Sequence, residues 1–292
     1  MKKIAVTGGS GGAGGATIRE LVAHGYEVVN VDHAAPTETL CPYVETDMMD
    51  FTAVVRAFDG CDAVAHFAGN PHPDNDFASG ADRFSGNTVS CFNAFQAAAE
   101  VGIKRVAWAS SETVYGFPFA TNVPSHMPLS EADRIDPQTA YAISKAASEF
   151  VAIEMHRLHG IDFLGLRLSN VLFTDPDHHA SYSLIPSYWP DFHSRKFNLW
   201  GYIDSRDTGR ATRLALESDV RGAEVFNIAA KDTIMKQDNR QLLEAVFPNT
   251  RVLPGTWARQ GFLDGSKAKA MFGFEPEHNW SEVLGVGAGA DR

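Results

Sequence analysis

Short apolar runs alternate with helix-length segments along most of this chain, from residue 4 to about residue 230. The apolar runs predict strands at residues 4–6, 28–32, 63–67, 105–109, 163–168 and 225–228. The segments between them predict helices at residues 17–24, 51–58, 87–101, 137–159 and 206–217. Strands that alternate with helices are typical of a parallel sheet with helices on both faces. The pattern therefore predicts an α/β fold with a doubly wound parallel sheet.

The composition changes after Asn170. Residues 173–198 hold three prolines, three histidines and several aromatic side chains. Two further helix-length segments are expected near residues 238–247 and 266–272. We interpret residues 1–172, with residues 199–230 returning to them, as the main α/β domain. Residues 173–198 and 231–292 are interpreted as a small cap over the edge of the sheet.

The segment from Thr7 to Gly14 is rich in glycine and joins the first expected strand to the first expected helix. Gly8, Gly11 and Gly14 fit the pattern T-G-x-x-G-x-x-G, which holds a dinucleotide pyrophosphate at a helix N-terminus. The first glycine permits a tight turn, the second exposes bare backbone, and the third lets helix and strand pack closely. Gly12 is an additional glycine of the same candidate site. The alternative is a merely flexible loop, which the flanking strand and helix disfavour.

Asp32 ends the second expected strand, where a carboxylate accepts hydrogen bonds from the ribose hydroxyls of a dinucleotide. No arginine or lysine follows it before Arg56, although a 2′-phosphate would need a cation here. The sequence therefore favours NAD over NADP as the cofactor. The alternative for Asp32 is an aspartate in a turn. Asp47 follows a short third strand and is expected to reach the adenine edge, with a surface turn as its alternative.

Tyr141 and Lys145 are four residues apart and therefore share one face of an expected helix. A free tyrosine titrates near 10, so a tyrosine base at neutral pH needs a shift of about three units, roughly 4 kcal/mol. One cation about 4 Å away supplies a stabilisation of that order at an effective dielectric of about 20. Lys145 and an oxidised nicotinamide ring are two such cations. The alternative is an ordinary aromatic–lysine pair on an exposed helix.

Together these segments resemble the extended short-chain dehydrogenases/reductases of the NAD-dependent epimerase/dehydratase type. The resemblance covers the chain from residue 4 to about residue 230. It is carried by Thr7 to Gly14, Asp32, Asn87, Ser110-Ser111, Val114-Tyr115-Gly116, Tyr141 to Lys145, Arg167 to Asn170 and Tyr202 to Asp207. It implies a Rossmann-like sheet in which residues 1–172 bind NAD, with a small C-terminal cap that binds the substrate.

The resemblance also implies roles for individual residues. Tyr141 is expected to be the acid/base and Lys145 its partner. Ser111 is expected to hold the substrate oxygen, in preference to its rival Ser110, because it stands three residues before Val114 as the family's serine or threonine does. The other expected neighbours are Ala68, Gly69 and Asn87 on the cofactor side, and Asn170 and His72 on the substrate side. Asn87 has the alternative of being only the N-cap of the helix that it opens.

The chain carries a net charge of −11, and its longest basic runs are two residues long. Nucleic acid repels such a chain, so we expect no nucleic-acid partner. No apolar run approaches the roughly 18 residues of a membrane-spanning helix, and the first residues lack the apolar stretch of a signal peptide. Cys41, Cys61 and Cys91 have no metal-ligand spacing and are expected to be reduced thiols. These features predict a cytoplasmic protein without a membrane partner.

The stretch between Asn170 and Tyr202 is short, about thirty residues, and holds only two cations, Arg195 and Lys196. A nucleotide diphosphate would need several cations. The stretch resembles the short cap of uronate dehydrogenases, which suggests a free sugar, a sugar acid or a similar polyol as substrate. We expect no metal, because no carboxylate–histidine spacing completes a site with His178, His179 and His193.

Three functions fit these observations. The favoured one is an NAD-dependent oxidoreductase that takes a hydride from a sugar-type substrate. The first alternative is a nucleotide-sugar epimerase similar to UDP-glucose 4-epimerase, in which NAD is reduced only transiently. The second is a non-catalytic protein that senses dinucleotides, which the presence of Ser111, Tyr141 and Lys145 disfavours.

The two long helices expected near residues 87 and 137 carry apolar residues on more than one face. Examples are Phe92 and Phe95 on the first, and Ile143 and Phe150 on the second. Such helices either pack fully inside or pair across a two-fold axis. Since the resembling family commonly dimerises through these helices, we expect a homodimer.

Overall fold

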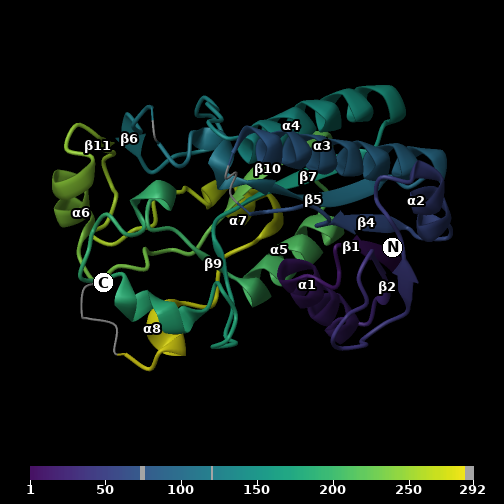
Figure 1. The fold of residues 1–292 in the computed structure, drawn as a ribbon, viewed down its shortest axis with the longest axis horizontal. Coiled ribbons are helices and arrows are strands. Elements are labelled where there is room, and N and C mark those ends of the chain that lie inside the picture. The colour runs from purple at the N-terminus through teal and green to yellow at the C-terminus, as the bar shows by residue number, and fades with distance from the viewer. Residues whose placement is uncertain (73–75, 120, 287–292) are drawn as a thin grey trace.

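A seven-stranded parallel sheet forms the centre of the molecule, with the strand order β10-β7-β5-β4-β1-β2-β3 (Figure 1). The computed structural model describes residues 1–72, 76–119 and 121–286 of the 292. The strands are β1 (Lys3–Thr7), β2 (Glu27–Asp32), β3 (Tyr43–Glu45), β4 (Ala63–His66), β5 (Arg105–Ser111), β7 (Asp162–Leu168) and β10 (Ala223–Ile228). After β1, the chain forms β2 and β3 on one side of β1. It then crosses to the other side of β1 and forms β4, β5, β7 and β10. This order places a topological switch point between β1 and β4.

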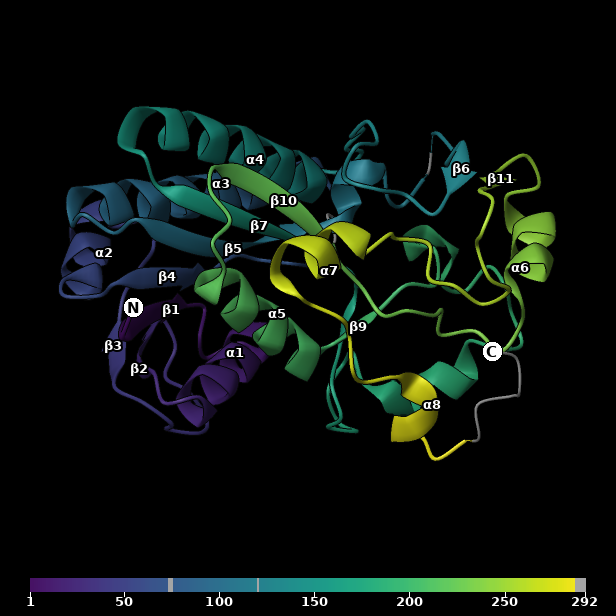
Figure 2. The same cartoon turned by 180° about the vertical axis from the view of Figure 1, so that it is seen from behind.

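Helices cover both faces of the sheet (Figure 2). One face packs on α1 (Gly12–Ala23), α5 (Ser205–Glu217) and α7 (Ser266–Phe272). The other face packs on α2 (Phe51–Phe58), α3 (Phe77–Glu100) and α4 (Ala140–His159). The inner strands are buried over most of their length because both faces are covered, whereas the edge strands β3 and β10 are less buried. The doubly wound parallel sheet predicted from the sequence is confirmed.

A third apolar core lies beyond the carboxyl ends of the strands and includes side chains from both segments that the sequence predicts to form a cap. Its large buried side chains include Trp200, Tyr202, Phe262 and Trp280. Two small sheets lie outside the central sheet, β6 (His126–Met127) with β11 (Arg251–Val252) and β8 (Val171–Leu172) with β9 (Ile203–Asp204). The remaining described elements are the helices α6 (Asn239–Val246) and α8 (Trp280–Val283) and the 3₁₀ turns η1 (Glu112–Tyr115), η2 (Tyr182–Ser187) and η3 (Lys196–Asn198).

The start of α3 differs from the expectation. The sequence predicts a helix that Asn87 opens, but α3 begins at Phe77, ten residues earlier. The start signal that was missed is a capping box, in which the Asp76 side chain accepts from the Ser79 amide (2.7 Å) and the Asp76 amide donates to Ser79 Oγ (3.0 Å). The alternative that Asn87 is a helix N-cap is therefore wrong, because Asn87 lies in the middle of α3.

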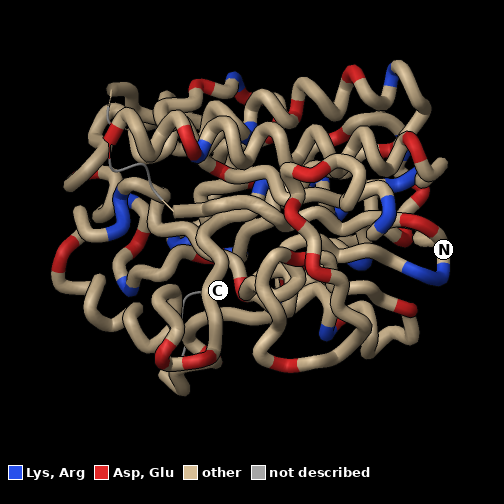
Figure 3. Tube along the Cα trace, turned by 45° about the vertical axis from the view of Figure 1, so that its right-hand side comes forward, with Lys and Arg blue, Asp and Glu red and all other residues tan. Residues whose placement is uncertain are grey.

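Acidic and basic residues are interspersed along the described chain, as Figure 3 shows. Among the described residues, no helix is both long and apolar enough to span a bilayer. The carboxyl ends of the parallel strands all meet at the edge that faces the cap. In sheets of this kind, ligands bind at that edge and near the switch point.

Candidate active site

The glycine loop between β1 and α1 has the geometry of a pyrophosphate cradle. Gly8 adopts a positive φ of 67°, and a Cβ atom there would lie 2.6 Å from the Ala68 backbone nitrogen. A Cβ at Gly14 would lie 2.1 Å from the Gly8 carbonyl oxygen. No side chain fits at either position, so the loop presents bare backbone at the N-terminus of α1. That surface suits a dinucleotide pyrophosphate, and the residues present fit NAD.

Asp32 lies against this loop. Its Oδ2 atom accepts a hydrogen bond from the Ser10 amide (3.0 Å), and its Oδ1 atom accepts one from the Ala34 amide (3.2 Å). The side chain of Asp32 is largely buried, and His33 Nδ1 lies 3.0 Å from Oδ1. The structure therefore brings Asp32 and the glycine loop together at the end of β2, where a ribose would follow the pyrophosphate.

Phe173 contacts the same loop, which the sequence did not suggest. A Cβ atom at Gly12 would lie 2.4 Å from the Phe173 ring. The rings of Phe173 and His178 are 3.9 Å apart, and those of His178 and His179 are 4.4 Å apart. Gly12 therefore makes room for an aromatic side chain of the cap segment. The additional glycine at position 12 was visible in the sequence, but it did not indicate that Phe173 would occupy the space beside it.

Ala68, Gly69 and Asn87 meet at the end of β4, next to Gly8. The Asn87 side chain accepts from the Asn70 amide (2.7 Å) and donates to the Asn70 carbonyl (3.1 Å). Asn87 thus holds the turn after Gly69. Beneath this turn, burial lowers the pKa of His66 to about 3, with a further contribution from the charge of Lys145, so the ring is neutral at physiological pH.

Two of the expected site residues, Asp47 and His72, lie outside the group formed by the glycine loop, Asp32 and the turn after β4. Asp47 is exposed, and its Oδ1 atom accepts from the amide of Met49 within the same turn. His72 is also exposed, with its ring centroid 6.0 Å from that of His179. Neither side chain contacts the glycine loop or the candidate catalytic residues through any hydrogen bond seen in the described part of the chain. Their assignment to cofactor and substrate stays a prediction.

Tyr141 and Lys145 lie in the first turns of α4. The helix begins after Thr139, whose hydroxyl accepts from the Ala142 amide (3.0 Å). Lys145 Nζ donates to the Ala109 carbonyl (2.7 Å) and lies 5.6 Å from the centroid of the Tyr141 ring. Because Ala109 belongs to β5, this bond fixes the Lys145 charge between Tyr141 and the strand that ends at Ser111.

Ser110 and Ser111 have different surroundings. Ser110 Oγ donates to Glu149 Oε1 (2.7 Å) inside the molecule. Ser111 Oγ accepts from the Thr113 amide (3.2 Å) and hydroxyl (3.0 Å), so its own proton remains free to donate. This arrangement favours Ser111 over Ser110 as the hydroxyl that holds a substrate oxygen.

A buried ion pair ties α4 to the sheet one turn after Lys145. Arg167 on β7 donates to both carboxylate oxygens of Glu149, at 2.9 and 2.8 Å. The same guanidinium donates to the Tyr115 hydroxyl (2.7 Å), which in turn donates to Asn227 Oδ1 (2.8 Å). The pKa of Arg167 is raised by Glu149 and Tyr115, against the effect of burial. The sequence could have indicated Glu149 as a partner near the site, because it stands four residues after Lys145 on the same helix face.

Glu112, which follows Ser111 directly, is a second residue that the sequence reasoning missed. Its side chain is buried at the point where β5 passes into η1. Burial raises its pKa to about 8, although the Ser169 hydroxyl, the Arg195 charge and the Asn170 amide each oppose the shift. Asn170 itself is half-buried at the end of β7, and its carbonyl accepts from the Ile203 amide (3.0 Å).

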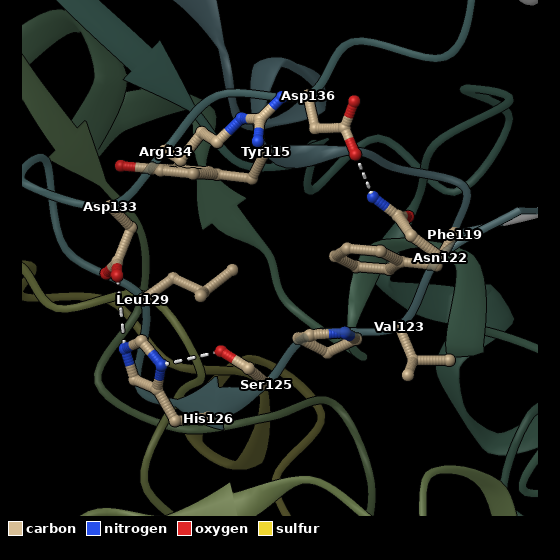
Figure 4. Close-up of a pocket in the computed structure, with 11 residues that line it drawn as sticks. Tyr115, Phe119, Asn122, Val123, Ser125, His126, Leu129, Asp133, Arg134 and Asp136 are labelled. Atoms are coloured by element: carbon tan, nitrogen blue, oxygen red, sulfur yellow. Dashed lines mark hydrogen bonds and ion pairs between the residues drawn. The ribbon is translucent and has the colours of Figure 1, made fainter.

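A cavity of about 280 Å³ is lined by Tyr115, the last residue of η1, and by residues between Phe119 and Asp136 (Figure 4). Inside it, His126 Nε2 lies 3.2 Å from Asp133 Oδ1 and His126 Nδ1 lies 3.1 Å from Ser125 Oγ. The lining includes Tyr115 and Phe119 but none of Ser111, Tyr141 and Lys145. The candidate active site is therefore a separate place on the sheet edge. Within the described residues, no group of three or more histidine, cysteine or acidic side chains is arranged to hold a metal ion.

The parallel sheet and the glycine loop at the end of β1 have the form of a dinucleotide-binding α/β fold, and Ser111, Tyr141 and Lys145 are its candidate catalytic residues. The model of the NAD dependent epimerase/dehydratase family matches residues 4–229, and the chain belongs to that family. It is thus an NAD-dependent enzyme of the extended short-chain dehydrogenase/reductase type, as the sequence predicted.

The relatives in this family carry out different reactions. The chain is 27% identical over 314 residues to a UDP-glucose 4-epimerase of Lacticaseibacillus casei, covering 94% of this chain and 92% of that protein. It is 32% identical over 182 residues to an L-arabinose 1-dehydrogenase (NAD(P)(+)) of Haloferax volcanii, covering 60% of this chain and 69% of that protein. A solved structure of a mutated uronate dehydrogenase is similar with a TM-score of 0.69 and 21% identity. The match covers 100% of this chain and 88% of that chain. The two relatives support NAD-dependent modification of a sugar without selecting one reaction, and the solved structure shows that the fold is shared.

Proposed function

We propose that this protein is an NAD-dependent dehydrogenase that oxidises a hydroxyl carbon of a free sugar, sugar acid or similar polyol. The observation that carries the proposal is the Lys145–Ala109 hydrogen bond of 2.7 Å, which holds Lys145, 5.6 Å from the centroid of the Tyr141 ring, against the strand that ends at Ser111. The acid/base and hydroxyl-holding roles of these residues remain part of the proposal, as does the assignment of Asp32 and the glycine loop to the cofactor.

In this mechanism, bound NAD supplies the hydride acceptor. Ser111 donates its free proton to the substrate oxygen and so orients the hydroxyl toward Tyr141. The Tyr141 phenolate accepts the hydroxyl proton, and the fixed positive charge of Lys145 stabilises that phenolate. Asp32 and the amides of the glycine loop hold the adenosine half, which leaves the catalytic residues to act at the other end of the cofactor.

The cap supports a free sugar over a sugar nucleotide. Between Asn170 and Tyr202, the only arginine and lysine are Arg195 and Lys196. The Arg195 guanidinium packs over the rings of Tyr188 (5.3 Å) and Phe197 (4.8 Å), so it is already engaged within the cap. Few cations remain here for a diphosphate, which prefers bidentate arginine contacts.

The test measures reduced nicotinamide formed from excess NAD with a panel of free sugars and uronic acids. We expect stoichiometric accumulation by the native protein and a loss of about 10²–10⁴-fold in kcat for Tyr141→Phe, because the proton acceptor is gone. The NAD dissociation constant of Tyr141→Phe serves as the control and is expected to stay near the native value. Interconversion of UDP-sugars without accumulation would instead indicate an epimerase, and NAD binding without turnover on either panel would indicate a sensor.

The proposal extends to assembly and location. The outer faces of α3 and α4 expose apolar side chains, among them Phe92 (45% exposed) and Phe150 (64% exposed), and a second copy of the chain would cover them. The cysteines Cys41, Cys61 and Cys91 are all free thiols, which suits a reducing compartment such as the cytoplasm.

A further inference from the structure

The cavity of about 280 Å³ that Tyr115 lines has an apolar interior and a charged rim (Figure 4). Tyr115, Phe119 and Leu129 form the buried part of its lining and are only 4%, 9% and 6% exposed. Arg134 and Asp136 belong to the exposed part of the lining. The cavity is therefore suited to a ligand that has an apolar body and one charged group.

Phe119 is held at the wall of this cavity in a left-handed backbone conformation. Its φ angle is 55°, which is unusual for a residue with a bulky side chain. Its amide donates to the Gly116 carbonyl (2.6 Å), and its ring lies 4.6 Å from the ring of Phe117. Backbone strain of this kind is concentrated at active sites and at segments that clamp ligands. The strain at Phe119 thus supports a binding role for the cavity, independently of its charges.

Asp136 brings to the rim a carboxylate that no cation neutralises. Its Oδ2 atom accepts a hydrogen bond from the side-chain amide of Asn122, which is a neutral donor. Although Arg134 is only two residues away, no ion pair joins it to Asp136 in the described part of the chain. The Asp136 carboxylate is therefore free to pair with a cation that enters the cavity.

Asp133 contributes a second carboxylate to the lining. Its Oδ2 atom accepts from the Ser130 amide (2.7 Å) and hydroxyl (3.0 Å), and its Oδ1 atom lies 3.2 Å from His126 Nε2. The other ring nitrogen of His126, Nδ1, lies 3.1 Å from Ser125 Oγ. Because both ring nitrogens are engaged, His126 has no donor left for an anionic ligand. Among the described lining residues, Arg134 is the only other basic one.

The charges of the lining favour a cation over an anion. Asp133 and Asp136 contribute two negative charges against the one positive charge of Arg134, which solvent screens because this side chain is exposed. Protonation of His126 would balance these charges without reversing their sign. The faces of tyrosine and phenylalanine rings also attract organic cations. A carboxylate or a phosphate would instead meet two like charges.

We propose that this cavity is a binding site for a small organic ammonium ion. The apolar body of the ion packs against Tyr115 and Phe119, and its ammonium group lies beside Asp136. Ligand pockets begin at about 300 Å³, so the ion is a small one. It is neither the substrate nor NAD, because the proposed catalytic residues and the glycine loop lie outside the lining. The site therefore goes beyond the proposed function and does not depend on it.

Three ligands that share a phenyl ring and differ in charge test the proposal, namely benzylamine, benzyl alcohol and benzoate. Isothermal titration calorimetry measures their binding to the NADH-loaded protein, in which the nicotinamide site is already occupied. We expect benzylamine to bind with a Kd below about 1 mM, about five-fold or more tighter than benzyl alcohol, and benzoate to bind most weakly. Equal affinities for the three, tighter binding of benzoate, or no binding of benzylamine would overturn the proposal.

Two variants of the rim have opposite expected effects. Asp136→Asn keeps an oxygen that accepts from Asn122, so we expect about five-fold weaker binding of benzylamine and unchanged binding of benzyl alcohol. Arg134→Ala removes the competing positive charge and is expected to bind benzylamine about two-fold more tightly and benzoate more weakly. Weaker benzylamine binding by Arg134→Ala would identify a site for anions and refute the proposal.

A third substitution locates the bound ligand. Val123 lines the cavity and is 57% exposed, so Val123→Trp fills the cavity from its rim without disturbing the apolar core. We expect it to lose benzylamine binding while its NADH dissociation constant stays at the native value. Val123→Ala is the matched control and should bind benzylamine normally. Unchanged benzylamine binding by Val123→Trp would place the ligand elsewhere and refute the site.

Discussion

Gly14 and Gly15 are neighbours in the first turn of α1, yet their surroundings differ. A Cβ at Gly14 would lie 2.1 Å from the Gly8 carbonyl, which belongs to a tight turn and cannot move freely. A Cβ at Gly15 would meet its nearest atom, the Gly9 carbonyl oxygen, at 3.5 Å, an ordinary contact. One glycine is therefore required by geometry and the other is not.

We expect Gly14→Ala to raise the NAD dissociation constant by about ten-fold or more, because the displaced loop no longer presents its amides to the pyrophosphate. Gly15→Ala is the matched control and is expected to bind NAD normally, with slightly higher stability from the better helix former. Isothermal titration calorimetry with NAD measures both constants. Equal affinities of the two variants would show that the loop does not hold the cofactor.

At the scale of elements, the position of α4 depends on contacts made from within the sheet. Lys145 reaches the Ala109 carbonyl of β5, and Glu149 forms two hydrogen bonds with Arg167 of β7. The side chains of the Glu149–Arg167 pair are 10% and 4% exposed. Removing one partner of such a pair leaves an uncompensated charge inside the molecule.

We expect Glu149→Leu to lower the free energy of unfolding by about 3–5 kcal/mol and to lower kcat as α4 shifts against β5. Arg157→Ala, which breaks the exposed Arg157–Glu154 pair on the same helix (2.7 Å), should cost at most about 1 kcal/mol. Denaturant unfolding of the two variants compares them directly. Similar small losses would mean that the buried pair does not fix the helix.

At the scale of the whole molecule, α3 and α4 leave one shared surface uncovered. Phe95 and Ala98 of α3 and Ala142 of α4 are buried, as one face of each helix packs inward. Ile143, Phe150 and Ile153 are 46%, 64% and 52% exposed on the other side of α4. An apolar surface of this kind on a monomer marks an interaction site.

We expect the native protein to be a homodimer through these helices and Phe150→Glu to be a monomer, because the carboxylate cannot be buried at an apolar interface. Met271→Glu changes a comparably exposed residue (43%) on α7, at the opposite face of the sheet, and should remain dimeric. Light scattering at micromolar concentration gives the molar mass of each. A monomeric native protein would contradict the assembly.

Much of this arrangement follows from local sequence patterns. The alternation of apolar runs and helices determines the doubly wound sheet, because both periods are set by backbone geometry over a few residues. The T-G-x-x-G-x-x-G pattern determines the loop at Gly8 and Gly14, where a side chain has no room. The spacing of four determines that Tyr141 and Lys145 share a face of α4.

Contacts between distant segments were decided only by the tertiary structure. Sequence alone could not choose between Ser110 and Ser111 by environment, since the choice depends on Glu149, 39 residues further along the chain. It could not foresee that Phe173 fills the space at Gly12, nor that the side chains of Glu112 and Ser169 both lie close to Gly201. Burial and hydrogen-bond partners depend on how elements pack, and packing joins residues whose separation along the chain carries no signal.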